Sequence, residues 1–127
     1  MSFAWSDFLA LAEALERHPA IPGPEEAVLR TAISRAYYSA FCSAREFAVT
    51  RDGLTIRRTG DDHNLVAAHF RFAPEQARRR IAFNLKRLRD FRNRADYDTA
   101  LVGTPKALAQ TSVALARNVL TALSALQ

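Results

Sequence analysis

The chain has little of what builds disulfide-rich, zinc-binding or membrane-spanning proteins. Its one cysteine, Cys42, has no CxxC partner and no nearby His/Cys cluster, so a disulfide framework and a structural zinc site are both excluded. No stretch approaches the roughly 20 apolar residues that cross a bilayer. Residues 1–7 lack the basic start of a signal peptide. We expect a cytoplasmic protein in which Cys42 is a small packed side chain.

Glycine, proline and β-branched residues are also scarce, and the first two fall between long Ala- and Leu-rich stretches. This composition is typical of all-α proteins. A chain of 127 residues, about half of them apolar, can build one core of ordinary size. We therefore expect a single domain over residues 1–127 with an all-α fold, an up-and-down bundle of four to five helices.

Capping and breaking residues divide the chain into five helices. Ser6 is expected to cap the first, Pro24 to open the second after a proline-rich turn, and Asp52-Gly53 to end it. Thr104-Pro105 is a capped start for the last helix. The predicted helices cover residues 6–17, 25–50, 61 or 62 to 72, 74 or 75 to 96, and 104 or 105 to near the C-terminus.

The formal net charge of +5 is carried almost wholly by arginine, since only Lys86 and Lys106 are lysines. Arginine suits planar, bidentate partners such as phosphate and carboxylate. Nucleic acid or an acidic protein is therefore permitted as a partner. A run such as residues 78–80, RRR, is more typical of a solvated helix start than of a binding site.

The fourth predicted helix places charge where apolar side chains belong. Counted at about 100° per residue, Ile81, Leu85 and Leu88 define a narrow apolar stripe. Arg92 falls near the centre of this stripe, with Asp96 close beside it. We expect a buried or half-buried Arg92–Asp96 pair.

Three blocks in this order give the chain a family likeness. They are residues 34–41, SRAYYSAF, in the second predicted helix; His63 at the start of the third; and residues 88–97, LRDFRNRADY, at the end of the fourth. Together they resemble the HEPN domains, in particular their small stand-alone bacterial and archaeal members. The resemblance covers roughly residues 25 to 126.

The resemblance implies a bundle of four or five helices, a homodimer, and a minimal nucleotidyltransferase as partner in a toxin–antitoxin type of pair. In active members it also implies a metal-independent ribonuclease, whose motif is an arginine, then usually a polar residue, and a histidine separated from the arginine by four to six residues. Arg92-Asn93 matches the start of this motif, but positions 97–99 hold no histidine. Arg58 and His63 have the spacing, but they span a predicted loop, and we interpret that match as coincidence.

The missing histidine weakens the catalytic interpretation. Cleavage of RNA without metal needs a base, an acid and a cation for the charge on phosphorus, and Arg92 could supply the cation. A tyrosine such as Tyr97, with an ordinary pKa near about 10, is a poor base. A neighbouring Arg92 would lower the pKa of Asp96, which makes that carboxylate a poor base too.

Three hypotheses follow for the Arg92 region. The first is a module that binds a nucleotidyltransferase partner, a nucleotide or RNA, with Arg92, Asn93, Arg94, Tyr38 and Ser34 in the binding site. The second is a ribonuclease that uses Arg92, Asp96 and Tyr97. The third is a structural adaptor, in which the Arg92–Asp96 pair holds the fourth helix against the second through the hydroxyl of Ser34 or Tyr38.

The remaining polar and aromatic residues favour structural roles. Tyr37 and Tyr38 are expected to be a core and a rim aromatic rather than a base-stacking platform. His63 is expected simply to start a helix, and His69 to be a packed histidine. Because helical metal ligands usually lie at i,i+4 spacing, these two histidines predict no metal site, and we expect no cofactor.

Phe83 predicts a subunit contact. It lies on the side of the fourth helix opposite Leu85 and Leu88, among charged residues where solvent is expected. We expect a homodimer that uses Phe83 in its interface. Light scattering at about tens of micromolar protein should give the mass of a dimer, since even a modest interface is populated there. The mass of a monomer would contradict the prediction.

Overall fold

The chain is all-α, as predicted, in a computed structural model that describes residues 2–17 and 24–126. Within these ranges there are five helices and no strand. The helices are α1 (Ser6–Arg17), α2 (Glu25–Asp52), α3 (Asp62–Arg71), α4 (Gln76–Tyr97) and α5 (Pro105–Ala125). The predicted turn over residues 18–23 lies outside the described residues. No helix in the described part of the chain has both the length and the apolarity needed to cross a membrane.

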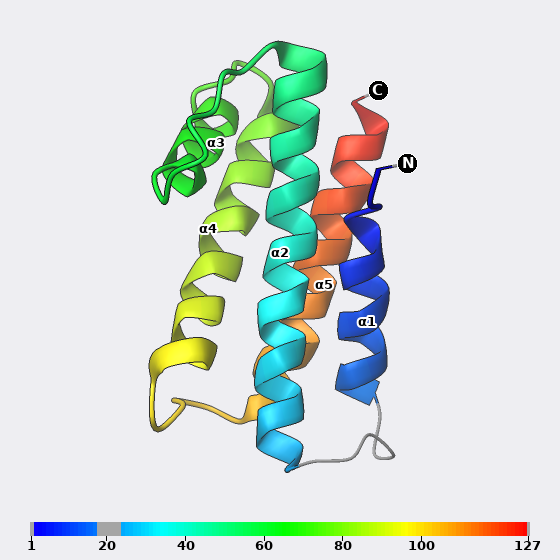
Figure 1. The fold of residues 1–127 in the computed structure, drawn as a ribbon, viewed down its shortest axis with the longest axis vertical. Coiled ribbons are helices and arrows are strands. Elements are labelled where there is room, and N and C mark those ends of the chain that lie inside the picture. The colour runs from blue at the N-terminus through cyan, green and yellow to red at the C-terminus, as the bar shows by residue number, and fades with distance from the viewer. Residues whose placement is uncertain (1, 18–23, 127) are drawn as a thin grey trace.

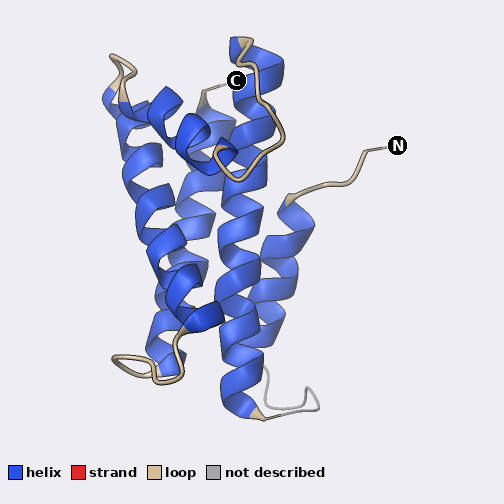
Figure 2. Cartoon of the chain, turned by 60° about the vertical axis from the view of Figure 1, so that its left-hand side comes forward, coloured by secondary structure: helices blue, strands red, loops and turns tan. Residues whose placement is uncertain are grey.

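The four long helices run up and down beside one another, and α3 is added at one end (Figure 1). The central helix is α2, which contacts α1, α3, α4 and α5. The short α3 lies against α4 near the end of α2, as the turned view also shows (Figure 2). Helix α2 therefore buries apolar side chains against several neighbours.

An alanine stripe on α2 allows this close packing. Ala32, Ala36, Ala40, Ala44 and Ala48 follow one another at every fourth residue, and each is 0% exposed. Side chains four residues apart share one face of a helix, so these methyl groups form a continuous narrow surface. The larger aromatic residues of α2 lie on neighbouring faces. Cys42 is buried in the same core, as expected.

The helix ends follow the predicted signals to within two residues. The second helix continues to Asp52, where Gly53 closes it in the left-handed conformation, φ 72°, and its N–H bonds the Ala48 carbonyl. Thr104 caps α5 by accepting a bond from the Ala107 N–H at 3.2 Å.

Helix α3 begins at Asp62, within the predicted bounds, but its N-cap residue makes no side-chain cap. Asp61 occupies the N-cap position, but its side chain makes no capping bond. The Asp62 carboxylate instead accepts a bond from the backbone N–H of Arg57 at 3.1 Å, which ties the preceding loop to the helix. Helix α3 also ends at Arg71, so that Phe72 lies beyond it and is 77% exposed.

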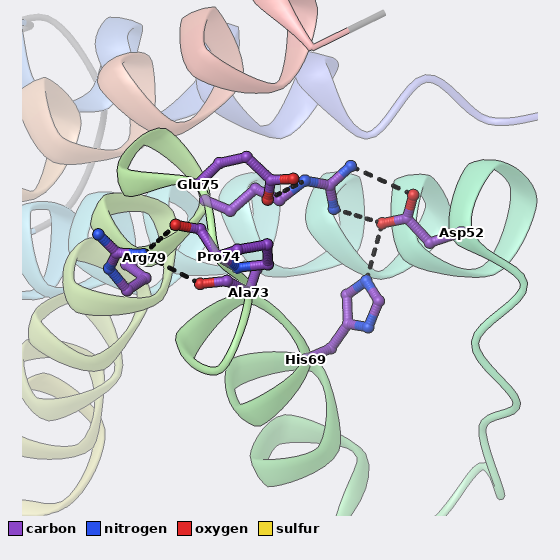
Figure 3. Close-up of polar contacts among 7 residues, drawn as sticks. Asp52, His69, Ala73, Pro74, Glu75 and Arg79 are labelled. Atoms are coloured by element: carbon purple, nitrogen blue, oxygen red, sulfur yellow. Dashed lines mark hydrogen bonds and ion pairs between the residues drawn. The ribbon is translucent and has the colours of Figure 1, made fainter.

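Three helices meet at the Asp52 clasp, which we define as Asp52 of α2, His69 of α3 and Arg78 of α4 (Figure 3). Arg78 Nη1 donates to Asp52 Oδ2 at 2.6 Å, and His69 Nε2 lies 2.7 Å from the same oxygen. His69 is therefore a hydrogen-bond partner of Asp52 rather than only a packed histidine. The clasp fixes α3 against the ends of its two neighbours.

Arg30 of α2 holds the other end of α4. Its Nη1 donates to the carbonyl oxygens of Ala95 at 2.9 Å and Asp98 at 2.6 Å, and its Nη2 donates to that of Thr99 at 3.3 Å. A cation at a helix C-terminus satisfies carbonyls that have no partner within the helix. The C-terminal end of α4, which carries Arg92 and Asp96, is therefore tied directly to α2.

We expect Asp52→Asn to lower the free energy of unfolding at neutral pH by about 1 kcal/mol, because it weakens charged hydrogen bonds in the clasp. The hydrogen bond from Arg78 holds the pKa of Asp52 below its ordinary value of 3.8. The stabilisation is therefore present above that value and is lost as the pH falls through the lower, folded-state pKa.

Urea denaturation at several pH values measures this difference. Asp90→Asn is the matched control, since the Asp90 carboxylate pairs with Lys86 where the side chains are 56% and 76% exposed. The free energy of unfolding should change less in Asp90→Asn than in Asp52→Asn. Equal losses for the two variants, or a difference that persists in acid, would contradict the prediction.

Candidate functional site

Arg92 is buried against α2, with only 9% of the residue exposed. Its guanidinium carbon lies 5.5 Å from the centroid of the Tyr37 ring and 5.4 Å from that of Tyr38. The Asp96 carboxylate lies 3.5 Å from its Nη1, so the predicted Arg92–Asp96 pair is present. Arg92 Nε is buried and has no hydrogen-bond partner among the described residues.

The way in which Arg92 meets α2 differs from the expectation. We expected the pair to hold the helices together through the hydroxyl of Ser34 or Tyr38. The Arg92 guanidinium instead lies over the ring faces of Tyr37 and Tyr38. Such cation–π contacts need the ring face, which the long tyrosine side chains present toward α4. Ser34 is buried, at 8% exposure. Tyr37 is a core residue and Tyr38 a half-buried rim residue, as predicted.

Tyr37 joins this arginine to His63. The Tyr37 hydroxyl makes a short hydrogen bond with His63 Nδ1. The His63 ring is stacked on Phe41, with centroids 4.2 Å apart and an interplanar angle of 15°. His63 is thus more than the helix-start residue that was expected, because aromatic side chains of α2 fix the position of its ring.

Burial and charge keep His63 neutral. Burial raises the pKa of Tyr37. The Tyr37 hydroxyl therefore keeps its proton and can donate a hydrogen bond to Nδ1; we assign it as the donor, which places the proton of the neutral ring on Nε2. Burial, and then the charges of Arg89 and Arg92, lower the pKa of His63 below its ordinary value of 6.5, against the opposing charge of Asp62.

A cavity of about 970 Å³ opens beside His63, between α3 and α4. We call it the α3–α4 groove. Its cationic side chains are Arg71, Arg79, Lys86 and Arg89, and its one acidic side chain is Asp90. Ala67, Ala68, Ala82 and Leu85 provide an apolar floor, and Asn64 and Asn93 add polar groups. The groove therefore combines apolar surface with an excess of positive charge.

Arg89 is the half-buried cation of the groove, whereas Arg71, Arg79 and Lys86 are exposed. Its Nη1 donates to Asn64 Oδ1 at 2.8 Å, and its buried Nε has no partner among the described residues. Asn64 follows His63 in α3, so this bond fixes Arg89 next to the histidine. Two neighbouring arginines of α4, Arg89 and Arg92, thus each carry a buried Nε without a partner.

The structure brings only some of the predicted site residues together. Asn93 lines the groove. The Arg94 guanidinium lies over the Phe91 ring, 4.9 Å from its centroid, and Tyr97 is 76% exposed; neither belongs to the groove lining in the described part of the chain. Asp96 faces Arg92, with its side chain 32% exposed.

Phe83 is exposed, as predicted, at 62%. It also lines the α3–α4 groove, and the Arg87 guanidinium lies 5.8 Å from the centre of its ring. A subunit contact through Phe83 would therefore cover part of the same groove.

Sequence reasoning missed the parts of the site that α3 contributes. His63 belonged to one of the blocks that carry the family likeness, which was the one available signal for it. Arg89 also lay in such a block, at the end of the fourth predicted helix, but nothing distinguished it from the other arginines there. Across residues 2–17 and 24–126, no group of three or more His, Cys, Asp or Glu side chains could hold a metal ion.

Comparison of the chain with models of protein families, with curated proteins and with solved structures gives no match. The fold class therefore rests on the helices themselves. A function has to be argued from the groove and from the residues that support it.

We expect Tyr37→Phe to raise the pKa of His63. The Tyr37 hydroxyl can donate to Nδ1 only while that nitrogen is unprotonated; once Nδ1 is protonated the hydroxyl accepts instead, and its own hydrogen loses this partner in a buried position. Removal of the hydroxyl therefore takes away a bond that favours the neutral ring. The pH dependence of the histidine ring protons in NMR spectra measures this change. Tyr38→Phe is the control, because the Tyr38 and His63 ring centroids are 6.4 Å apart and no hydrogen bond joins these side chains. An unchanged or lower pKa in Tyr37→Phe would contradict the assigned donor.

Proposed function

We propose that this protein is a HEPN-like helical module that binds a nucleotide or RNA in the α3–α4 groove. The observation that carries the proposal is the charge of the groove, where four cationic side chains face one acidic one. Contacts from arginine and lysine to phosphate supply most of the affinity of proteins for nucleic acids. The likeness of residues 34–41 and 88–97 to HEPN domains supports the same assignment.

The geometry of Arg89 suits a phosphate. A guanidinium has five N–H donors, and the bond from Arg89 to Asn64 uses one of its Nη1 hydrogens. Its half-buried position reduces screening by water, so a bound anion interacts with it more strongly than with a fully solvated arginine. Arg79 and Lys86 can add contacts along a nucleic-acid backbone, and the aromatic face of Phe83 can stack with a base.

In this proposal Arg92 supports the groove indirectly, through the side chains of Tyr37 and His63. It is absent from the groove lining in the described residues, but it packs on Tyr37, which in turn holds His63. The alternative ribonuclease would require a reacting phosphate to reach Arg92, which is 9% exposed. It would also require Asp96 or Tyr97 to act as a base, and the Asp96 carboxylate is already paired with the Arg92 guanidinium. Binding therefore has more support from the geometry than cleavage.

The resemblance also leads us to propose protein partners. A minimal nucleotidyltransferase, as in toxin–antitoxin pairs, and a second copy of the chain are the partners that it implies. The exposure of Phe83 supports a contact of this kind. Co-purification of the chain with the product of a neighbouring nucleotidyltransferase gene would identify the first partner.

We expect Arg89→Ala to weaken binding of a fluorescent single-stranded RNA oligonucleotide about tenfold, and to reduce the salt dependence of binding, because one phosphate contact is lost. Fluorescence anisotropy at several salt concentrations measures both effects. Lys86→Ala should weaken binding in the same direction; its side chain is 76% exposed, so the fold should be undisturbed.

Arg117→Ala is the matched control, since it removes the same charge from α5, where Arg117 pairs with Glu13 outside the groove. Equal losses for Arg89→Ala and Arg117→Ala would contradict a site in the groove. Two further variants, Arg92→Ala and Tyr97→Phe, distinguish the alternatives. RNA degradation that is lost in Arg92→Ala and Tyr97→Phe would favour the ribonuclease, whereas Arg92→Ala that loses stability alone would favour the structural adaptor.

A further inference from the structure

His63 lies at the junction of two cavities. It lines the α3–α4 groove, and with Phe41 it also lines a second cavity of about 550 Å³ on the side of the loop before α3. The bond from Tyr37 and the stack on Phe41 fix the plane of its ring. The ring is half-buried. His63 is therefore a positioned, ionisable group in the wall of the groove.

We propose that His63 is part of the binding site for a phosphodiester and takes up a proton from solvent when the phosphodiester binds. The inference rests on the proposed function, because it assigns a role to His63 in the same groove. The bound state would then hold an imidazolium beside Arg89, and both would face one phosphate. In the free state the ring is neutral with its proton on Nε2; the added proton goes to Nδ1, where the Tyr37 hydroxyl then accepts a hydrogen bond instead of donating one.

The groups around His63 come from every element packed against it. They are Asp62 of α3, Tyr37, Tyr38 and Arg45 of α2, Arg89 and Arg92 of α4, and Arg58 of the preceding loop. Four of them are cations and one is a carboxylate. This excess of positive charge, together with burial, opposes a further positive charge on the ring.

A bound phosphodiester makes protonation of the His63 ring more favourable. Its negative charge beside Arg89 offsets the repulsion that the ring experiences from the arginines, so the protonated ring becomes more favourable in the complex than in the free protein. Binding and protonation then assist each other. By linkage, affinity must rise as the pH falls from the pKa of His63 in the complex toward its lower pKa in the free protein.

The test uses uridylyluridine, a dinucleotide with one phosphodiester that keeps its single negative charge across the range. NMR titration of the full chain from about pH 8 to about pH 5.5 follows both the affinity and the ring protons of His63. We expect binding to become about threefold to tenfold tighter toward low pH, and the pKa of His63 to rise in the complex.

His63→Gln should abolish the pH dependence of binding and keep the weaker affinity of the high-pH state. His69→Gln is the matched control, because His69 pairs with Asp52 and is absent from the groove lining in the described residues; it should keep the dependence. The ring signals of the unsubstituted protein report on protonation directly, so the test holds even if a variant fails to fold.

Two failures are distinguishable. If Arg89→Ala weakens binding, but neither pH nor His63→Gln affects it and the pKa of His63 is the same with and without dinucleotide, the inference is overturned and the proposed function stands. If the unsubstituted protein does not bind the dinucleotide in the groove at any pH, the inference and the proposed function both fail.

Discussion

Close packing along the alanine stripe of α2 is the constraint on which the rest of the structure depends. Five alanines, from Ala32 to Ala48, are fully buried, so neighbouring helices can approach the α2 backbone on that side. Side chains at neighbouring positions are turned by about 100° on a helix, so Tyr37 and Tyr38 face other partners. Those partners are Arg92 of α4 and His63 of α3. The arrangement of the core therefore decides which residues can meet in the site.

Much of the fold could be predicted because its signals are local. Proline at position 24, Gly53 and Thr104 mark helix ends through their own backbone preferences, and the structure follows them. The Arg92–Asp96 pair was also predictable, since both residues lie one turn apart on the stripe that Ile81 begins. A departure from an apolar pattern within one helix is visible without knowing what the helix packs against.

The rest of the site was not predictable because it depends on where α3 lies. His63 and Tyr37 are 26 residues apart and belong to different helices, so no periodicity connects them. Helix α3 is placed by the Asp52 clasp, whose members come from three helices. In the sequence each of these residues resembles an ordinary surface charge. Only their contacts with one another in the folded protein distinguish them. The same holds for Arg89, whose bond to Asn64 gives it a fixed position among many solvated arginines.

Positive charge exceeds negative charge around Arg89 and Arg92, unlike in a purely structural ion pair. Asp96 lies 3.5 Å from Arg92, and the nearby Arg89 is bound to a neutral amide. Burial of a cation is costly unless its charge and its donors are satisfied, and each of these arginines has a buried Nε without a partner in the described part of the chain. Packing alone would be served as well by an apolar side chain at position 92. Under the proposed function, an anion in the groove beside His63 would balance the charge of Arg89, while Arg92 stays paired with Asp96 outside the groove lining of the described residues.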